Sequence, residues 1–416
     1  MKSKQSVQAA NTFYNSAGTL VYFACQYLLT ILVARIGGLR DAGIFSLVLS
    51  VTNIFACISL FGLRNFQVSD VEGKYSDKTY LKAWFSAILL SLILFLVIVP
   101  FLRLGQETLV CSLIYMIYKT GETLSDLTFS FYQKSDRYRS ILYSLCLKGL
   151  LTLIVFGTVL WFTKSLTVTL ALMTGIYFVI LLVFDFPRLK KRLNLSDKAP
   201  TSSVRQILLQ CWPLMLYTAL VPYLNFITRF LVEKQYGQTI LGGYSSVTII
   251  ISVLSTFMNS VFVTIIPELS SNYLNRKYKA IQSKLIYISG GIAAMVAVIC
   301  LAAAWIGNWV FELVFGAQIL DYMYLLQPTI LASGLLTFHT FFSSLLISFH
   351  KIKHVLYSSL LAALLTTVCV FPFVQLWGLS GSVFSMIAGL LASSLWQLTV
   401  ILKDLKTAPV KEQVKG

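Results

Sequence analysis

The 416-residue chain has too many apolar side chains and too few charges for a soluble globule. Hydrophobic residues make up 57% of it and charged residues only 12%, against about 25% charged in a typical soluble domain. The net charge of +17 is spread over many short segments between apolar stretches, so we expect no nucleic-acid partner and take the lipid bilayer to be the solvent.

Twelve stretches are apolar and long enough to cross a bilayer as helices, which takes about 20 residues each. They span residues 11–34, 42–61, 83–101, 109–131, 140–162, 167–185, 207–232, 244–266, 285–306, 325–349, 355–376 and 380–402. None alternates strictly between apolar and polar residues, as the strands of a membrane β-barrel do. The sequence therefore predicts an all-α integral membrane protein of about twelve transmembrane helices.

The basic residues predict how these helices are oriented. With Met1 placed in the cytoplasm, 25 of the 33 Lys and Arg residues fall in connections on that side and five on the other. This bias is the positive-inside pattern, and it predicts a multi-pass protein with both termini in the cytoplasm.

A hairpin between the first two spans recurs in the second half of the chain. Residues 32–48 read LVARIGGLRDAGIFSLV and residues 231–247 read LVEKQYGQTILGGYSSV, without a gap. An even number of spans separates the copies, so both point the same way. This predicts two pseudo-symmetric six-helix halves related by an axis along the membrane normal. The predicted halves are residues 1–190 and 207–416, joined by a basic cytoplasmic linker at 191–206.

Polar residues form a stripe along one face of the first predicted helix. At about 100° per residue, Asn11, Asn15, Gly18, Tyr22 and Gln26 project within a narrow arc. Such a stripe favours the wall of a polar cavity, although hydrogen bonding between helices would use the same residue types.

The fourth predicted helix carries charged residues on one face. Tyr115, Lys119, Glu122 and Asp126 are spaced by four, three and four residues, and Lys119 can pair with Glu122. One interpretation is a structural ion pair between helices. The other is a carboxylate that binds a coupling cation, next to a cation that binds substrate.

Two more cations lie inside predicted spans. Lys148 falls in the fifth span and Arg229 in the seventh, where Arg229 can also reach the membrane interface. The seventh span contains Pro213 and Pro222, with Asn225 just after the second proline. Because proline removes a backbone donor and can bend a helix, this span suits a moving transporter.

No motif indicates a metal or cofactor site. The seven cysteines all fall in apolar spans without a CxxC pair, and no GxxxxGK[ST] nucleotide loop is present. His350 and His354 are four residues apart, but they lie at a Lys-rich edge beside Lys351 and Lys353, which favours an interfacial role.

Five segments carry a resemblance to a known family. They read NTFYNSAGTLVYFACQYLLTILVARIGGLRDAGIFSLV, GLRNFQVSDVEGKYS, GQTILGGYSSV, IIPELSSNY and LWGLSGSVFSMIAG. With these segments the chain resembles the polysaccharide repeat-unit flippases of the multidrug/oligosaccharidyl-lipid/polysaccharide exporter superfamily. GLRNFQVSD, which includes Arg64, is the most specific of them.

The resemblance implies a substrate and a location. The substrate would be an undecaprenyl-diphosphate-linked oligosaccharide repeat unit, moved from the cytoplasmic to the outer leaflet of the bacterial cytoplasmic membrane. Flipping would be by alternating access, coupled to a cation gradient (proton or sodium) or to the membrane potential. No cofactor and no enzymatic step are implied.

The site residues come from the polarity of the helices, because a diphosphate needs cationic hydrogen-bond donors. The candidates for substrate binding are Lys119, Lys148, Arg229, Arg35 at the outer end, Arg64 at the inner mouth, and Asn15, Gln26 and Asn225. The candidates for the coupling ion are Glu122 and Asp126.

Three other function classes compete with this interpretation. A multidrug exporter of the same superfamily would have a cavity dominated by acidic and aromatic groups, whereas intramembrane cations here are at least as numerous as carboxylates. A membrane polysaccharide polymerase would need a large outward loop, and the longest outward connection, residues 307–324, is short and apolar. A scaffold without a transport role fits poorly with two repeated halves.

Overall fold

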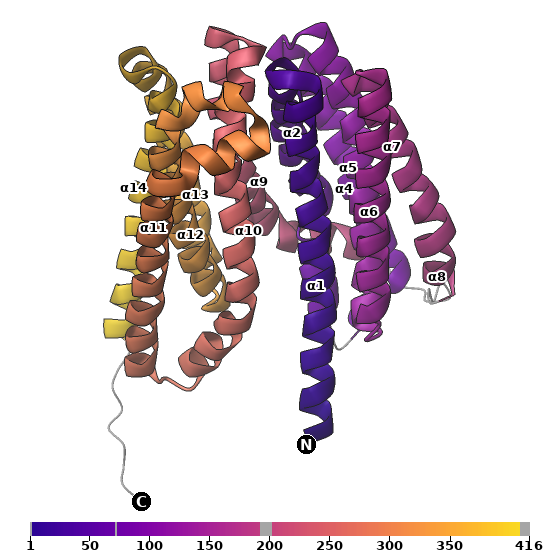
Figure 1. The fold of residues 1–416 in the computed structure, drawn as a ribbon. Coiled ribbons are helices and arrows are strands. Elements are labelled where there is room, and N and C mark those ends of the chain that lie inside the picture. The colour runs from indigo at the N-terminus through magenta and orange to yellow at the C-terminus, as the bar shows by residue number, and fades with distance from the viewer. Residues whose placement is uncertain (1, 71–72, 192–201, 408–416) are drawn as a thin grey trace, which may run out of the picture. The chain divides into compact units, whose positions relative to one another are not determined.

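The computed structural model describes residues 2–70, 73–191 and 202–407, so most of the predicted 191–206 linker lies outside the described residues. Every regular element in these ranges is a helix (Figure 1). The long helices are α1 (Lys2–Leu32), α2 (Gly38–Leu60), α4 (Asp77–Ile98), α5 (Gln106–Lys134), α6 (Tyr138–Thr163), α7 (Leu166–Ile180), α9 (Ser202–Tyr236), α10 (Gln238–Leu274), α11 (Tyr278–Phe315), α12 (Leu326–Ser348), α13 (Ile352–Trp377) and α14 (Leu379–Thr407). Shorter elements are α3 (Leu63–Ser69), α8 (Phe186–Lys190), the π-helical turns Val33–Gly37 and Leu181–Asp185, and the 3₁₀ turns Val99–Leu102 and Ala317–Leu325.

These helices confirm the predicted membrane protein. Ten stretches of the described chain are long and apolar enough to cross a bilayer, and one of them, Phe13–Ser69, contains both α1 and α2. α5 is not among the ten because charged side chains interrupt its middle. Counting α1 and α2 separately and adding α5 gives the twelve predicted spans.

Two predicted connections are instead largely helical. α11 continues to Phe315, and a 3₁₀ turn follows at Ala317–Leu325, so residues 307–324 do not form an open outward loop. The connection after the second span forms α3, in which Leu63 and Gln67 are buried. Apolar residues inside each connection explain the difference, since they gain by packing against neighbouring helices.

The described chain separates into two compact units. The first comprises Met1–Ser246 and Val314–Gly316, and the second Val247–Leu313 and Ala317–Gly416. In the first unit α1 packs along α6, and α2 packs against α4, α5 and α9 (Figure 1). The first unit therefore extends beyond the predicted linker, through α9 and into α10, and the boundaries of the repeated halves stay a prediction.

The repeated hairpin forms a reciprocal contact within the first unit. A Cβ added at Gly43 would lie 1.9 Å from the carbonyl oxygen of Gln238, and one added at Gly242 would lie 1.8 Å from that of Leu39. Gly43 and Gly242 occupy equivalent positions in the two copies, and so do Leu39 and Gln238. Gly38 and its equivalent, Gly237, share a positive φ of 83° and 84°. A contact that repeats with its partners exchanged is what a two-fold axis between the copies produces.

Buried, uncharged polar groups join three helices of the second unit. His339 on α12 contacts the hydroxyls of Ser393 on α14 (2.6 Å) and Ser359 on α13 (3.3 Å). Gln397 on α14 donates to Ser343 at 2.9 Å and Ser358 at 2.8 Å. These buried hydrogen bonds join α12, α13 and α14, and α14 also packs extensively against both α12 and α13.

Candidate functional site

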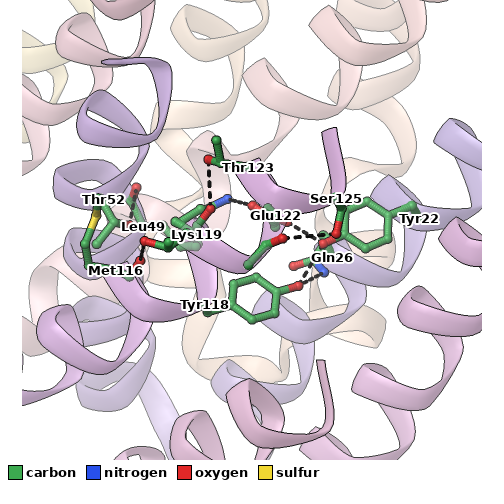
Figure 2. Close-up of polar contacts among 12 residues, drawn as sticks. Tyr22, Gln26, Leu49, Thr52, Met116, Tyr118, Lys119, Glu122, Thr123 and Ser125 are labelled. Atoms are coloured by element: carbon green, nitrogen blue, oxygen red, sulfur yellow. Dashed lines mark hydrogen bonds and ion pairs between the residues drawn. The ribbon is translucent and has the colours of Figure 1, made fainter. Parts of the chain in front are cut away.

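The polar stripe on α1 meets the charged face of α5. The Tyr22 hydroxyl donates to a carboxylate oxygen of Glu122 and lies 2.8 Å from the hydroxyl of Tyr118. Gln26 Nε2 donates to the same Tyr118 hydroxyl at 2.8 Å. Lys119 Nζ donates to Glu122 Oε2 at 2.7 Å, which confirms the predicted pair (Figure 2). Glu122 thus shares its negative charge between an ammonium and a phenol, with about a fifth of its side chain exposed.

A second cluster surrounds Arg64 on α3. Its Nη1 donates to Asp126 Oδ1 at 2.5 Å, its Nε to Gln133 Oε1 at 3.1 Å, and its Nη2 approaches Asn15 Oδ1 at 3.5 Å. The structure therefore brings together three residues that the sequence analysis had proposed separately: Asn15, Arg64 and Asp126. Gln133 was not predicted as part of this cluster, because it is uncharged and lies seven residues beyond Asp126.

Hydrogen bonds from α3 and from the loop that follows it fix the position of α3, and with it Arg64. The buried Gln67 side chain accepts from the Trp84 indole at 3.0 Å and from the Ser130 hydroxyl at 2.8 Å. Asp70 accepts from the backbone N–H of Lys74 (2.9 Å) and of Tyr75 (3.2 Å) and from the Tyr80 hydroxyl (2.9 Å). Partial burial raises the pKa of Asp70, but these donors outweigh it and hold the pKa below its usual value.

A third cluster is buried in the interior of the first unit. Lys148 on α6 forms an ion pair with Asp185 Oδ2, and both side chains are fully buried. The Lys148 ammonium also donates to Ser125 and lies 4.8 Å from the centre of the Tyr177 ring. Ser144 donates to the same Asp185 oxygen at 3.0 Å. In this conformation a bound substrate would not reach Lys148.

Asp185 was not predicted from the sequence as the partner of Lys148. Asp185 is the last residue of the sixth predicted span, where a carboxylate ordinarily reaches water. The π-helical turn Leu181–Asp185 ends at Asp185, whose side chain is buried. One signal in the sequence could have pointed to such a partner, because a lysine inside a membrane needs a counter-ion.

Arg229 on α9 has a different environment from the other cations. Its Nη1 donates to the Ser50 hydroxyl at 2.9 Å and approaches the Ser46 carbonyl oxygen at 3.4 Å. Within the described residues no carboxylate lies within ion-pair distance of it. Asn225 lies one helical turn earlier on α9 and is half-buried.

Arg35 lies just after α1, in the π-helical turn Val33–Gly37. Its Nε donates to the carbonyl oxygen of Val314 at 2.7 Å, and the side chain is exposed. Over the described residues no three His, Cys, Asp or Glu side chains come together as metal ligands would. In the described part of the first unit, the groups that could act on a substrate are therefore charged side chains within the membrane, some of them in ion pairs and some not.

Comparison with known proteins identifies the family. A profile described as polysaccharide biosynthesis protein matches residues 8–273, well over half of the chain. This chain belongs to the polysaccharide biosynthesis protein family. A member of similar sequence, the capsular polysaccharide biosynthesis protein CapF of Staphylococcus aureus, is 24% identical over 319 residues, which cover 74% of this chain and 77% of CapF.

Solved structures show the same fold at low sequence identity. A multidrug resistance MATE family transporter of the MOP superfamily, in an inward-facing conformation, matches with a TM-score of 0.70 at 15% identity and covers 96% of each chain. A variant of the Vibrio cholerae MATE transporter VcmN matches with a TM-score of 0.66 at 14% identity, covering 98% of this chain and 99% of VcmN. Family and fold together identify a multi-pass membrane protein that has the fold of these transporters.

Proposed function

We propose that this protein is a transporter that flips an undecaprenyl-diphosphate-linked oligosaccharide repeat unit from the cytoplasmic to the outer leaflet by alternating access. The observation that supports this best is the environment of Arg229. A half-buried guanidinium within a membrane helix normally pairs with a carboxylate, whereas within the described residues Arg229 has hydrogen bonds to a serine hydroxyl and a carbonyl oxygen and no ion pair. A diphosphate would supply the missing negative charge through charge-assisted hydrogen bonds.

The other cations of the site differ in how readily they can bind substrate. Lys119 and Arg64 are partly exposed and each holds a carboxylate, so a phosphate must compete with Glu122 or Asp126 for them. A proton or sodium ion on Glu122 would weaken its hold on Lys119. Substrate and coupling-cation binding are thereby linked at this pair, and Asp126 offers the same linkage at Arg64.

The remaining candidates have supporting roles in this proposal. Asn15, Gln26 and Asn225 offer amide groups to sugar hydroxyls, and Arg35 contacts the anion at the outer end of its path. The polyprenyl chain stays in lipid. Both termini lie in the cytoplasm, as the distribution of basic residues predicts.

One observation favours export of a cationic drug as a second candidate. Glu122 lies among the phenol rings of Tyr22 and Tyr118, and Tyr118 contacts the rings of Tyr115 and Tyr177. An acidic group among aromatic rings can bind an organic cation. The two candidates differ in the charge that they require of the substrate.

The experiment depletes the protein in its native host and measures both lipid-linked glycans and drug susceptibility. Flipping requires that complete undecaprenyl-diphosphate repeat units accumulate while surface polymer is lost. Unchanged lipid-linked pools with raised drug susceptibility would support the drug exporter instead.

Complementation with variants then tests the anion site. We expect Arg229→Gln to abolish export and Arg229→Lys to restore part of it, since the lysine keeps the charge but loses the bidentate geometry. Arg205→Gln, which removes an exposed charge from the same helix, is the matched control and should export normally. Normal export by Arg229→Gln would refute the assignment of Arg229.

A further inference from the structure

A basic pocket lies at the end of the first unit where α5, α6 and α8 meet. It has a volume of about 520 Å³ and is lined by Tyr132, Ser135, Arg137, Ser140, Arg188 and Lys191. Three of these six residues carry a positive charge and none a negative one. By the distribution of basic residues this end faces the cytoplasm.

The pocket has the donors that bind a phosphate group. Arg137 is the N-cap of α6, a helix of 26 residues, and its own side chain makes no capping hydrogen bond to the backbone N–H groups of the first turn. A helix N-terminus attracts anions, and Ser140 in the first turn adds a hydroxyl. Asp136, the carboxylate next to this turn, receives a hydrogen bond from Asn11 at 3.5 Å.

Two contacts with Phe184 hold the Arg188 side chain in place. Its Nη1 donates to the carbonyl oxygen of Phe184, and its guanidinium lies 3.7 Å from the centre of the Phe184 ring. A guanidinium fixed in this way loses less conformational entropy on binding an anion than a free one.

Lipid-facing side chains directly precede these cations in the chain. Leu182, Val183 and Phe186 are 59%, 72% and 54% exposed, as expected of residues in contact with acyl chains. At a rise of about 1.5 Å per residue, Arg188 and Lys191 lie within about one and a half turns of Phe186. A ligand with its phosphate in the pocket can therefore place its apolar part along this surface.

We propose that the pocket binds the headgroup of an anionic phospholipid of the cytoplasmic leaflet, with its phosphate held by Arg137, Arg188 and Lys191. Basic pockets among transmembrane helices on the cytoplasmic side suit such headgroups. The bound lipid connects the α5–α6 turn to α8 and so stabilises the end of the first unit. This proposal does not depend on which substrate the transporter carries.

The test measures lipid binding to the full-length protein in a neutral detergent by native mass spectrometry. The variant Arg137→Gln/Arg188→Gln/Lys191→Gln removes the charges that line the pocket. Its matched control, Lys134→Gln/Arg139→Gln/Lys190→Gln, removes the same number of charges from exposed positions outside the lining. We expect short-chain phosphatidylglycerol to bind the wild type and the control alike, and the pocket variant about a hundredfold more weakly.

Three further probes identify the source of the phosphate. Phosphatidylcholine, whose headgroup is zwitterionic, and inorganic phosphate should not displace bound phosphatidylglycerol at equal concentration. Displacement by either would overturn the anionic-lipid assignment. So would equal weakening in the control variant, which would indicate diffuse attraction. Stronger binding of farnesyl diphosphate than of phosphatidylglycerol would reassign the pocket to a prenyl diphosphate.

Discussion

The buried ion pair between Lys148 and Asp185 leads to a quantitative prediction about the stability of the first unit. Both side chains have no solvent exposure, so removing one charge leaves the other without its counter-ion in a medium that solvates it poorly. Such a change typically costs about 3–5 kcal/mol of folding free energy.

The contacts that remain in each single variant indicate where its loss of folding free energy should lie within that range. Lys148→Met leaves the Asp185 carboxylate with the Ser144 hydroxyl on Oδ2, while Oδ1 is buried with no partner among the described residues. This variant should lie near 5 kcal/mol. Asp185→Asn leaves the ammonium with the Ser125 hydroxyl and the Tyr177 ring, so it should cost nearer to 3 kcal/mol.

The double variant Lys148→Met/Asp185→Asn should be more stable than either single variant, because it leaves no unpaired charge. Equilibrium unfolding of the detergent-solubilised protein would measure the coupling energy, expected to be at least about 2 kcal/mol. Additive effects, or single variants costing less than about 1 kcal/mol, would refute the structural role. Export by the double variant adds a second readout: a stable but inactive protein would show that the charged pair is required for export and not only for folding.

Three further predictions concern other parts of the first unit. Gly43→Ala should destabilise the protein by more than about 2 kcal/mol, because its Cβ would overlap a backbone carbonyl, whereas Gly175→Ala, which has open space around it, should be neutral in the same unfolding assay. Because its pKa is lowered in the folded protein, Asp70 should stabilise the fold above the ordinary aspartate pKa of about 4. That contribution should disappear as the pH falls below this range, and Asp70→Asn should lack this acid-dependent loss in thermal unfolding. Glu122→Gln should remove the dependence of export on the cation gradient; a variant that keeps this dependence would exclude Glu122 as the coupling site.

The parts of the site that the sequence predicts correctly are those that depend on spacing along one chain segment. Lys119 and Glu122 are three residues apart on one helix, so their pairing follows from helix geometry alone. The contact between Gly43 and Gly242 was not itself predicted, but the ungapped repeat made both positions equivalent, and the structure shows them in reciprocal contact.

The parts that the sequence does not predict depend on partners from distant helices. Asp185 is 37 residues from Lys148, and Arg64 is 62 residues from Asp126. Many apolar packings would satisfy the same hydropathy pattern, so the pattern does not select which polar groups meet. The role of Gln67 was hidden for a related reason: a short polar segment between spans resembles a solvated loop until its burial is known.

The two units differ in the charged pairs that they contain. The pairs Lys119–Glu122, Arg64–Asp126 and Lys148–Asp185 all belong to the first unit. In the described part of the second unit the buried polar groups around His339 and Gln397 are hydroxyls and amides. Only charged groups respond strongly to a phosphate or to a coupling cation. The second unit has ion pairs as well, Lys284–Glu268 and Lys351–Asp404, but both are partly exposed. The fully buried pair of the described chain, Lys148–Asp185, lies in the first unit, so among the described residues a movement of the second unit breaks no fully buried ion pair.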